Sequence, residues 1–238
     1  MNLTIFGPAY YTDIERLKFF NQSAIHHRVK VHLYGFGKPF GSWIQTHIED
    51  CLYELKWMTS DVAMFTDTAD ALWLTDATEI EDKYIAMGRP PLLIGAEHSG
   101  ANGGGWIGER LEAIRILEIL AKDDSSGDPQ VRWRNAIQDG RIHVELDQRS
   151  WIFQIMGEDT LEIKSGRIRN TVTGSWPCLL HCAGGSSHSI FGKNERIGPL
   201  WEALLNDSGG IQNVTQGDRN SVESSPIIGR QSNDNLAT

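Results

Sequence analysis

Residues 61–73 read DVAMFTDTADALW, with two aspartates, Asp67 and Asp70, between two apolar runs. The first run predicts a buried strand that ends at Asp67. Two carboxylates this close together among apolar residues repel each other unless a cation or a hydrogen-bond donor lies between them. Two interpretations are open. Either the pair binds a divalent metal at a strand end, or it forms a helix N-cap and a first-turn acid, which need no metal.

Strand and helix patterns alternate along the chain around this stretch. Strands are predicted for residues 2–7, 29–37, 61–67 and 90–97 and within 141–156 and 175–185, and helices for residues 12–27 and 42–58. This alternation is typical of an α/β fold with a mostly parallel sheet. Ligands of such sheets bind beyond the carboxyl ends of the strands. Asp67, Glu97 and His181 all fall at predicted strand ends, which is the first functional signal.

Composition bounds the class of protein. We expect one domain over residues 1–205 and a flexible tail over residues 206–238, which are rich in Gly, Ser, Asn, Asp and Gln. No apolar run approaches the roughly 18 to 20 residues of a membrane span. Three cysteines form no disulfide framework and the N-terminus resembles no signal peptide, so we expect a cytoplasmic protein. The net charge of −9 argues against broad electrostatic binding to nucleic acid. The sequence does not indicate an oligomeric state.

Three further constellations each allow a structural and a functional interpretation. His181, within CLLHC, is either a buried histidine bonded to a backbone carbonyl or a metal ligand. Residues 102–108, NGGGWIG, favour a tight turn into a helix, although Asn102, Gly103 and Gly104 would also allow a ligand to approach the backbone closely. Asp128, within KDDSSGDPQ, belongs to a solvated acidic loop unless its carboxylate faces a reacting centre.

Six short motifs occur in an order that resembles a known family. They are FTDTAD (65–70), GAE (95–97), NGGGWIG (102–108), DPQ (128–130), LDQRSWIFQ (146–154) and WPCLLHCAGG (176–185). They resemble, in order, the motifs F-[TV]-D-S-Y-D, S-A-E, N-S-G-G-F-I-G, the end of an aspartate-rich D-D-Q segment, L-D-H-x-x-R-I-F-Q and L-P-[IV]-[VL]-[IV]-H-G-N-G. These motifs characterise the glycosyltransferase domain of the procollagen lysyl hydroxylases. More distantly, the chain resembles glycogenin and other GT-A glycosyltransferases.

The resemblance implies a GT-A fold, with a Rossmann-like and mostly parallel sheet flanked by helices, and specific roles for several residues. It implies that Asp67, Asp70 and His181 bind Mn²⁺. The donor nucleotide-sugar would lie near a larger set, which comprises Phe6, Gly7, Asp67, Glu97, Asn102, Gly103 and Gly104. Glu97 and Asp128 are the candidate catalytic carboxylates, with Asp128 on the acceptor side.

The chain also departs from the family pattern. Ala69 replaces the tyrosine that is expected against the nucleobase, and Cys182-Ala183 replaces Gly-Asn after the histidine. The acidic run before Asp128 is interrupted, and the helix before the metal strand has no clear match for the donor-binding lysine. These departures leave nucleotide preference and acceptor recognition open.

The implied function is a Mn²⁺-dependent glycosyltransferase that moves glucose or galactose from UDP-glucose or UDP-galactose to a hydroxyl group. The acceptor would be hydroxylysine or galactosyl-hydroxylysine in a peptide, another hydroxylated polymer or glycan, or hydroxymethylated DNA in a microbial or viral setting. The sequence does not decide between inversion and retention at the anomeric carbon. Two other classes stay open: a non-catalytic protein that binds nucleotide-sugars or glycans, and a metal-dependent phosphoesterase or nucleotidyltransferase.

Overall fold

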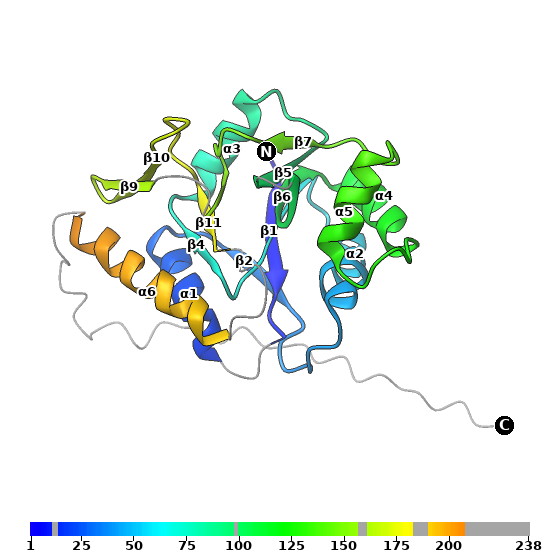
Figure 1. Cartoon of the computed structure of the whole chain (residues 1–238), viewed down its shortest axis with the longest axis horizontal. Coiled ribbons are helices and arrows are strands. Elements are labelled where there is room, and N and C mark those ends of the chain that lie inside the picture. The colour runs from blue at the N-terminus through cyan, green and yellow to red at the C-terminus, as the bar shows by residue number, and fades with distance from the viewer. Residues whose placement is uncertain (11–13, 98–99, 157–160, 183–189, 208–238) are drawn as a thin grey trace.

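The computed structural model describes residues 1–10, 14–97, 100–156, 161–182 and 190–207 (Figure 1). The helical elements are η1 (Ile14–Leu17), α1 (Lys18–His26), η2 (Gln45–Glu49), α2 (Asp50–Trp57), α3 (Ala77–Ala86), α4 (Arg110–Ala121), α5 (Pro129–Gln138) and α6 (Ile190–Asp207). The strands are β1 (Leu3–Pro8), β2 (Val31–Tyr34), β3 (Val62–Thr66), β4 (Ala71–Trp73), β5 (Leu92–Glu97), β6 (Gly100–Glu109), β7 (Glu145–Asp147), β8 (Phe153–Ile155), β9 (Leu161–Lys164), β10 (Arg167–Asn170) and β11 (Leu179–His181).

The main sheet has six strands in the order β2-β1-β3-β6-β5-β7. Strand β1 pairs in parallel with β2 and β3, and β5 pairs in parallel with β7, whereas β6 runs antiparallel to both β3 and β5. Within this sheet β6 is therefore the one strand of opposite direction. The predicted α/β fold with a mostly parallel sheet is confirmed.

Side chains of the central strands point alternately into two apolar cores, because successive residues of a strand face opposite sides. Phe65 of β3 belongs to a core with residues of α2, α4 and α5, while Met64 belongs to a core with residues of α1 and α3. The helices α2, α4 and α5 lie together on one side of the sheet in Figure 1, and α1 and α6 lie on the other. All five residues of β3 are buried, as expected for a strand covered on both faces.

A second, three-stranded sheet places the end of β11 beside the end of β3. Its order is β4-β11-β8, and His181 pairs with Ala71 of β4 and with Ile155 of β8. The backbone N–H of Cys182 donates to the carbonyl oxygen of Asp70 at 2.7 Å. This pairing brings His181 next to Asp70 although more than a hundred residues separate them.

The glycine-rich stretch is a strand, so the expected tight turn into a helix is wrong. Residues 100–109 form β6, which pairs with β3 on one side and with β5 on the other, and α4 begins only at Arg110. The register with β5 shifts between Ile94, opposite Trp106, and Gly95, opposite Asn102. Gly103, Gly104 and Gly105 therefore have no partner in β5, and a bulge of this kind often redirects the chain beside a functional site.

Residues 206 and 207, the first two of the predicted tail, belong to helix α6. Helix α6 ends at Asp207, and residues 208–238, which make up most of the predicted tail, lie outside the described residues. Among the helices of the described segments, none is both long and apolar enough to cross a membrane.

Candidate metal centre

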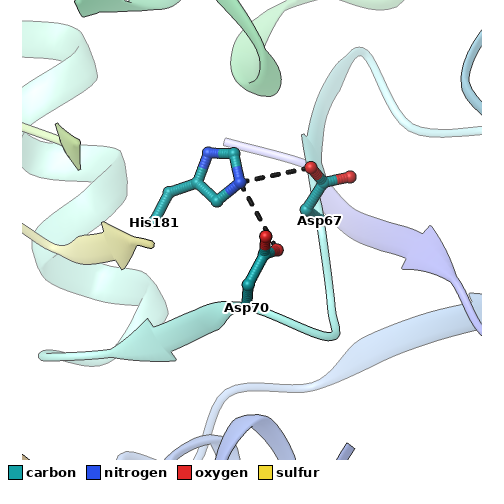
Figure 2. A group of neighbouring side chains, drawn as sticks. All are labelled: Asp67, Asp70 and His181. Atoms are coloured by element: carbon teal, nitrogen blue, oxygen red, sulfur yellow. Dashed lines mark ion pairs between the residues drawn. The ribbon is translucent and has the colours of Figure 1, made fainter. Parts of the chain in front are cut away.

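Asp67, Asp70 and His181 form one cluster at the carboxyl ends of β3 and β11 (Figure 2). Nε2 of His181 lies 3.2 Å from Oδ2 of Asp67 and 3.4 Å from Oδ1 of Asp70. One ligand atom from each residue lies within 4.8 Å of the other two. Ligands about 2.1 Å from a six-coordinate ion lie about 3 Å apart, so this spacing is compatible with a divalent cation.

Asp70 and His181 are buried, Asp67 is partly buried, and the charges of the three groups act strongly on one another. Burial acts to raise the pKa of Asp67, but attraction to His47 and hydrogen bonds from His181 and His47 outweigh it and hold this pKa well below its usual range. Burial acts to lower the pKa of His181, but Asp70 and Asp67 raise it above that of an ordinary histidine. The opposite shifts of these two pKa values show that the cluster favours a positive charge beside the two carboxylates.

Two observations show that the cluster fits a metal ion. A Cβ on Gly104 would lie 2.6 Å from Oδ2 of Asp67 and 2.8 Å from Nδ1 of His181, so only glycine leaves the cluster open on this side. Nε2 of His181 faces a carboxylate oxygen of both Asp67 and Asp70, so one nitrogen and two oxygen ligands point at a common position. Two hard carboxylates and one imidazole suit a first-row divalent ion better than Ca²⁺.

Glu97 and Asn102 lie behind the glycine bulge and hold it against the cluster. Oε2 of Glu97 accepts from the amide of Asn102 at 3.1 Å, and Oδ1 of Asn102 accepts from the N–H of Gly104 at 3.0 Å. The carbonyl oxygen of Gly104 in turn accepts from the N–H of Asp67 at 2.7 Å. A continuous set of hydrogen bonds thus runs from Glu97 to the backbone of Asp67.

The other oxygen of Glu97 binds helix α5. Oε1 accepts from Nε2 of Gln130 at 2.6 Å and pairs with Arg134, while Oε1 of Gln130 accepts from the N–H of Gly103 at 2.9 Å. Both oxygens of Glu97 are therefore engaged, which favours a positioning role over proton transfer. The sequence prediction gave Gln130 and Arg134 no role at the site: it placed Gln130 at the end of an acidic loop and assigned no element to residues 131–138. The Asp-Pro pair at 128–129, typical of a helix start, was the signal for this helix.

The remaining predicted residues, Asp128, Phe6 and Gly7, have other contacts in the structure. Asp128 is exposed and caps α5: its Oδ1 accepts from the N–H of Gln130 at 2.8 Å. Phe6 is fully buried, and its ring packs edge-on against Phe65, so its side chain belongs to the core. Gly7 lies against the segment after β3, where a Cβ would be 2.7 Å from Cγ2 of Thr68.

His47 also contacts the cluster, although no sequence pattern selects it. Its Nε2 lies 2.7 Å from Oδ1 of Asp67, on the side of the carboxylate away from His181. His47 belongs to η2, one turn of π-helix at the start of the helix predicted for residues 42–58. Helical periodicity marks its apolar face but does not indicate which polar residue meets a carboxylate from another strand.

Comparisons with known proteins bear on the fold. No family model matches the sequence, and no curated protein matches it. The chain is similar to the solved glycosyltransferase that is involved in the glycosylation of the major capsid of PBCV-1. The TM-score is 0.54 and the identity 9%, over 83% of this chain and 98% of that one. The chain is less similar to the glycosyltransferase GlyE of Streptococcus pneumoniae TIGR4. That alignment has a TM-score of 0.48 and 13% identity and covers 86% of this chain and 62% of GlyE. With 9% identity the first similarity establishes the fold alone: the chain has the GT-A fold that the resemblance predicts.

Proposed function

We propose that this protein is a Mn²⁺-dependent glycosyltransferase that moves a hexose from UDP-glucose or UDP-galactose to a hydroxyl group. The observation that carries the proposal is the Asp67, Asp70 and His181 cluster, which lies where the carboxyl end of β3 in the main sheet meets the carboxyl end of β11 in the second sheet. Ligand sites in open α/β sheets lie at such strand ends. The same three residues match the metal motifs of the lysyl hydroxylase glycosyltransferase domain.

The chemistry requires stabilisation of a diphosphate leaving group. A divalent ion, when bound, supplies a Lewis acid that stabilises this negative charge. Asp67, Asp70 and His181 would hold the ion, and the absence of a side chain at Gly104 leaves room beside it. The hydrogen bonds from Glu97 through Asn102 fix the backbone of this bulge, so the donor would meet a preformed surface.

The proposed acceptor follows from the resemblance to the lysyl hydroxylase glycosyltransferase domain. We propose a hydroxylated acceptor, either hydroxylysine or galactosyl-hydroxylysine in a peptide, another glycan or polymer, or hydroxymethylated DNA. An inverting reaction needs a general base near the acceptor hydroxyl, for which Asp128 is the candidate, whereas a retaining reaction needs none. The exposed position of Asp128 leaves its carboxylate accessible from solvent.

The experiment is a screen for UDP release from nucleotide-sugars with Mn²⁺, in the presence and absence of EDTA, followed by trials of acceptors. We expect release that EDTA abolishes and that Asp67→Ala removes. Asp61→Asn is the matched control, because Asp61 is an exposed acid at the opposite end of β3. Mn²⁺-dependent turnover that survives in Asp67→Ala would rule out the proposed site.

Two other outcomes would replace the proposed function. Binding of UDP without turnover, whatever acceptor is offered, would indicate a non-catalytic nucleotide-sugar or glycan-binding protein, a class that the change to Ala69 keeps open. Release of UMP rather than UDP would indicate a phosphoesterase or nucleotidyltransferase that uses the same carboxylates.

A further inference from the structure

The two oxygens of Asp67 face two different histidines. Oδ2 lies 3.2 Å from Nε2 of His181, within the cluster, and Oδ1 lies 2.7 Å from Nε2 of His47, outside it. An ionised carboxylate only accepts hydrogen bonds, so the ring of His47 carries its proton on Nε2 and donates to Oδ1. His47 therefore occupies one oxygen of Asp67 and leaves the other to the cluster.

The ring of His47 is held by packing. Its side chain is 9% exposed and lies between two aromatic rings, with centroid distances of 5.0 Å to Trp43 and 5.8 Å to Phe65. The backbone around it forms a π-turn, an uncommon conformation that is frequent at functional sites. Nδ1 of His47 is buried and has no hydrogen-bond partner among the described residues, so within them the contact to Asp67 is the polar interaction that orients this ring.

A histidine–carboxylate contact also occurs elsewhere in the chain, and it provides a comparison. His32 lies 3.0 Å from Glu54, but its side chain is 52% exposed and neither residue belongs to the cluster. The pair of His47 and Asp67 differs because it is enclosed and because Asp67 is a candidate metal ligand. Hydrogen bonds to the outer oxygen of a metal-binding carboxylate fix its orientation.

We propose that His47 is a positioning residue for the metal: it holds Oδ1 of Asp67 so that this carboxylate presents only Oδ2 to the ion. This inference rests on the metal site of the proposed function. It adds a residue to that site from η2, a segment that contributes none of the three ligands. Loss of such an outer contact typically weakens metal binding about 10- to 100-fold.

Two substitutions test the proposal, because their side-chain amides differ in how far they extend towards Asp67. In His47→Gln the amide nitrogen replaces Nε2 and can still donate to Oδ1, whereas in His47→Asn the amide nitrogen falls at the position of Nδ1 and cannot reach it. Both variants lose the imidazole and its contacts with Trp43 and Phe65. His47→Phe keeps a ring in that space but has no donor, and His32→Gln is the control at the surface pair.

The measurement is Mn²⁺ binding to the substrate-free protein. The electron paramagnetic resonance signal of the free ion reports how much Mn²⁺ remains unbound, and thermal unfolding checks the fold of each variant. We expect His47→Asn and His47→Phe to raise the Kd for Mn²⁺ about 10- to 100-fold, and His47→Gln and His32→Gln to stay close to the wild type. Should His47→Asn fail to fold, His47→Phe provides the same comparison.

The results separate this proposal from the proposed function. Equal losses in His47→Gln and His47→Asn would overturn positioning by a hydrogen bond, as would wild-type affinity in both His47→Asn and His47→Phe. If the wild type binds Mn²⁺ and the variants behave as expected, but no nucleotide-sugar is turned over, the positioning role stands and the proposed function fails. If the wild type transfers sugar and the variants bind Mn²⁺ with wild-type affinity, the proposed function stands and the positioning role of His47 fails.

Discussion

Gly104 faces the ring of His181 at a distance that admits no side chain. A Cβ on Gly104 would lie 2.8 Å from Nδ1 of His181, closer than Cβ atoms approach other groups in real structures, and closer still to Cε1 of the same ring. The backbone of Gly104 is fixed on both sides, because its N–H donates to Asn102 and its carbonyl oxygen accepts from Asp67. His181 is also fixed, because β11 pairs with both β4 and β8.

Gly104→Ala should therefore disrupt the metal centre while the fold survives. The added methyl group must displace His181 or Asp67, and a shift of about 1 Å in such a site can lower activity on the order of 100-fold. Gly127→Ala is the matched control, since nothing lies within 4 Å of a Cβ there and its backbone is not left-handed. Measured together, Mn²⁺ affinity and UDP release should fall in Gly104→Ala and not in Gly127→Ala. Unchanged Mn²⁺ binding in Gly104→Ala would contradict the tight fit.

Asp128 can be tested as a cap and as a base separately. Asparagine caps a helix about as well as aspartate but cannot accept a proton, whereas alanine does neither. If Asp128 only caps α5, Asp128→Asn should keep full activity, and Asp128→Ala should lose about 1 kcal/mol of stability in denaturant unfolding. If Asp128 is the general base of an inverting reaction, both substitutions should lower kcat about 100-fold or more. A high kcat in Asp128→Asn would remove Asp128 from the catalytic residues.

The grouping of Asp67 with His181 was predictable from the sequence, but its details were not. Apolar runs that end in polar residues locate strand ends, but β3 and β11 belong to different sheets, so the way in which these two ends meet came from the structure. Short range patterns predicted a turn at Gly103 because four glycines in seven residues normally avoid regular structure. The pairing of β6 with β3 and β5 overrides that tendency, and the pairing with β3, which is distant in sequence, leaves no local trace.

The contacts of His47 and Glu97 illustrate a second limit. Both residues act through side chains that reach a partner from another element, and only the packing of η2 and α5 against the sheet determines those partners. Glu97 lies at a strand end, as predicted, but its ion pair with Arg134 depends on helix α5, which was not predicted from the sequence. Motif order therefore indicated which residues gather, while the direction of each side chain required the structure.

The side chain of Asp147 connects the beginning of the stretch LDQRSWIFQ (146–154) to its end through hydrogen bonds. Its buried carboxylate accepts from the backbone N–H groups of Trp151, Ile152 and Phe153 at 2.8–2.9 Å. These bonds fix the turn into β8, on which β11 and His181 align. Asp147→Leu would leave three enclosed N–H groups unpaired, at about 1–3 kcal/mol each, so we expect a loss of at least 3 kcal/mol of unfolding free energy.

Urea unfolding measures this loss, with Glu145→Gln, an exposed acid on the same strand, as the control. Asp147→Asn retains one oxygen acceptor and should fall between Asp147→Leu and the wild type. A stable Asp147→Leu protein would show that the turn into β8 is held by other contacts.

Glu79 should make stability depend on pH in the acidic range. Burial acts to raise its pKa, but hydrogen bonds from Lys83, Thr75 and Arg167 outweigh it and lower the pKa to about 2. Because the pKa is lower in the folded state than in the unfolded chain, protonation favours unfolding. The stabilisation is complete above about pH 5, near which an unfolded glutamate becomes ionised, and it disappears as the pH falls towards 2.

Glu79→Gln should remove about 2 kcal/mol at pH 7 and progressively less below pH 4. Urea unfolding of both proteins at pH 7 and pH 3 tests this, and Glu118→Gln, which breaks an exposed pair with Lys56, should change stability much less at either pH. A difference between Glu79→Gln and the wild type that stays constant from pH 7 to pH 3 would show that the charge of Glu79 is not what stabilises the fold.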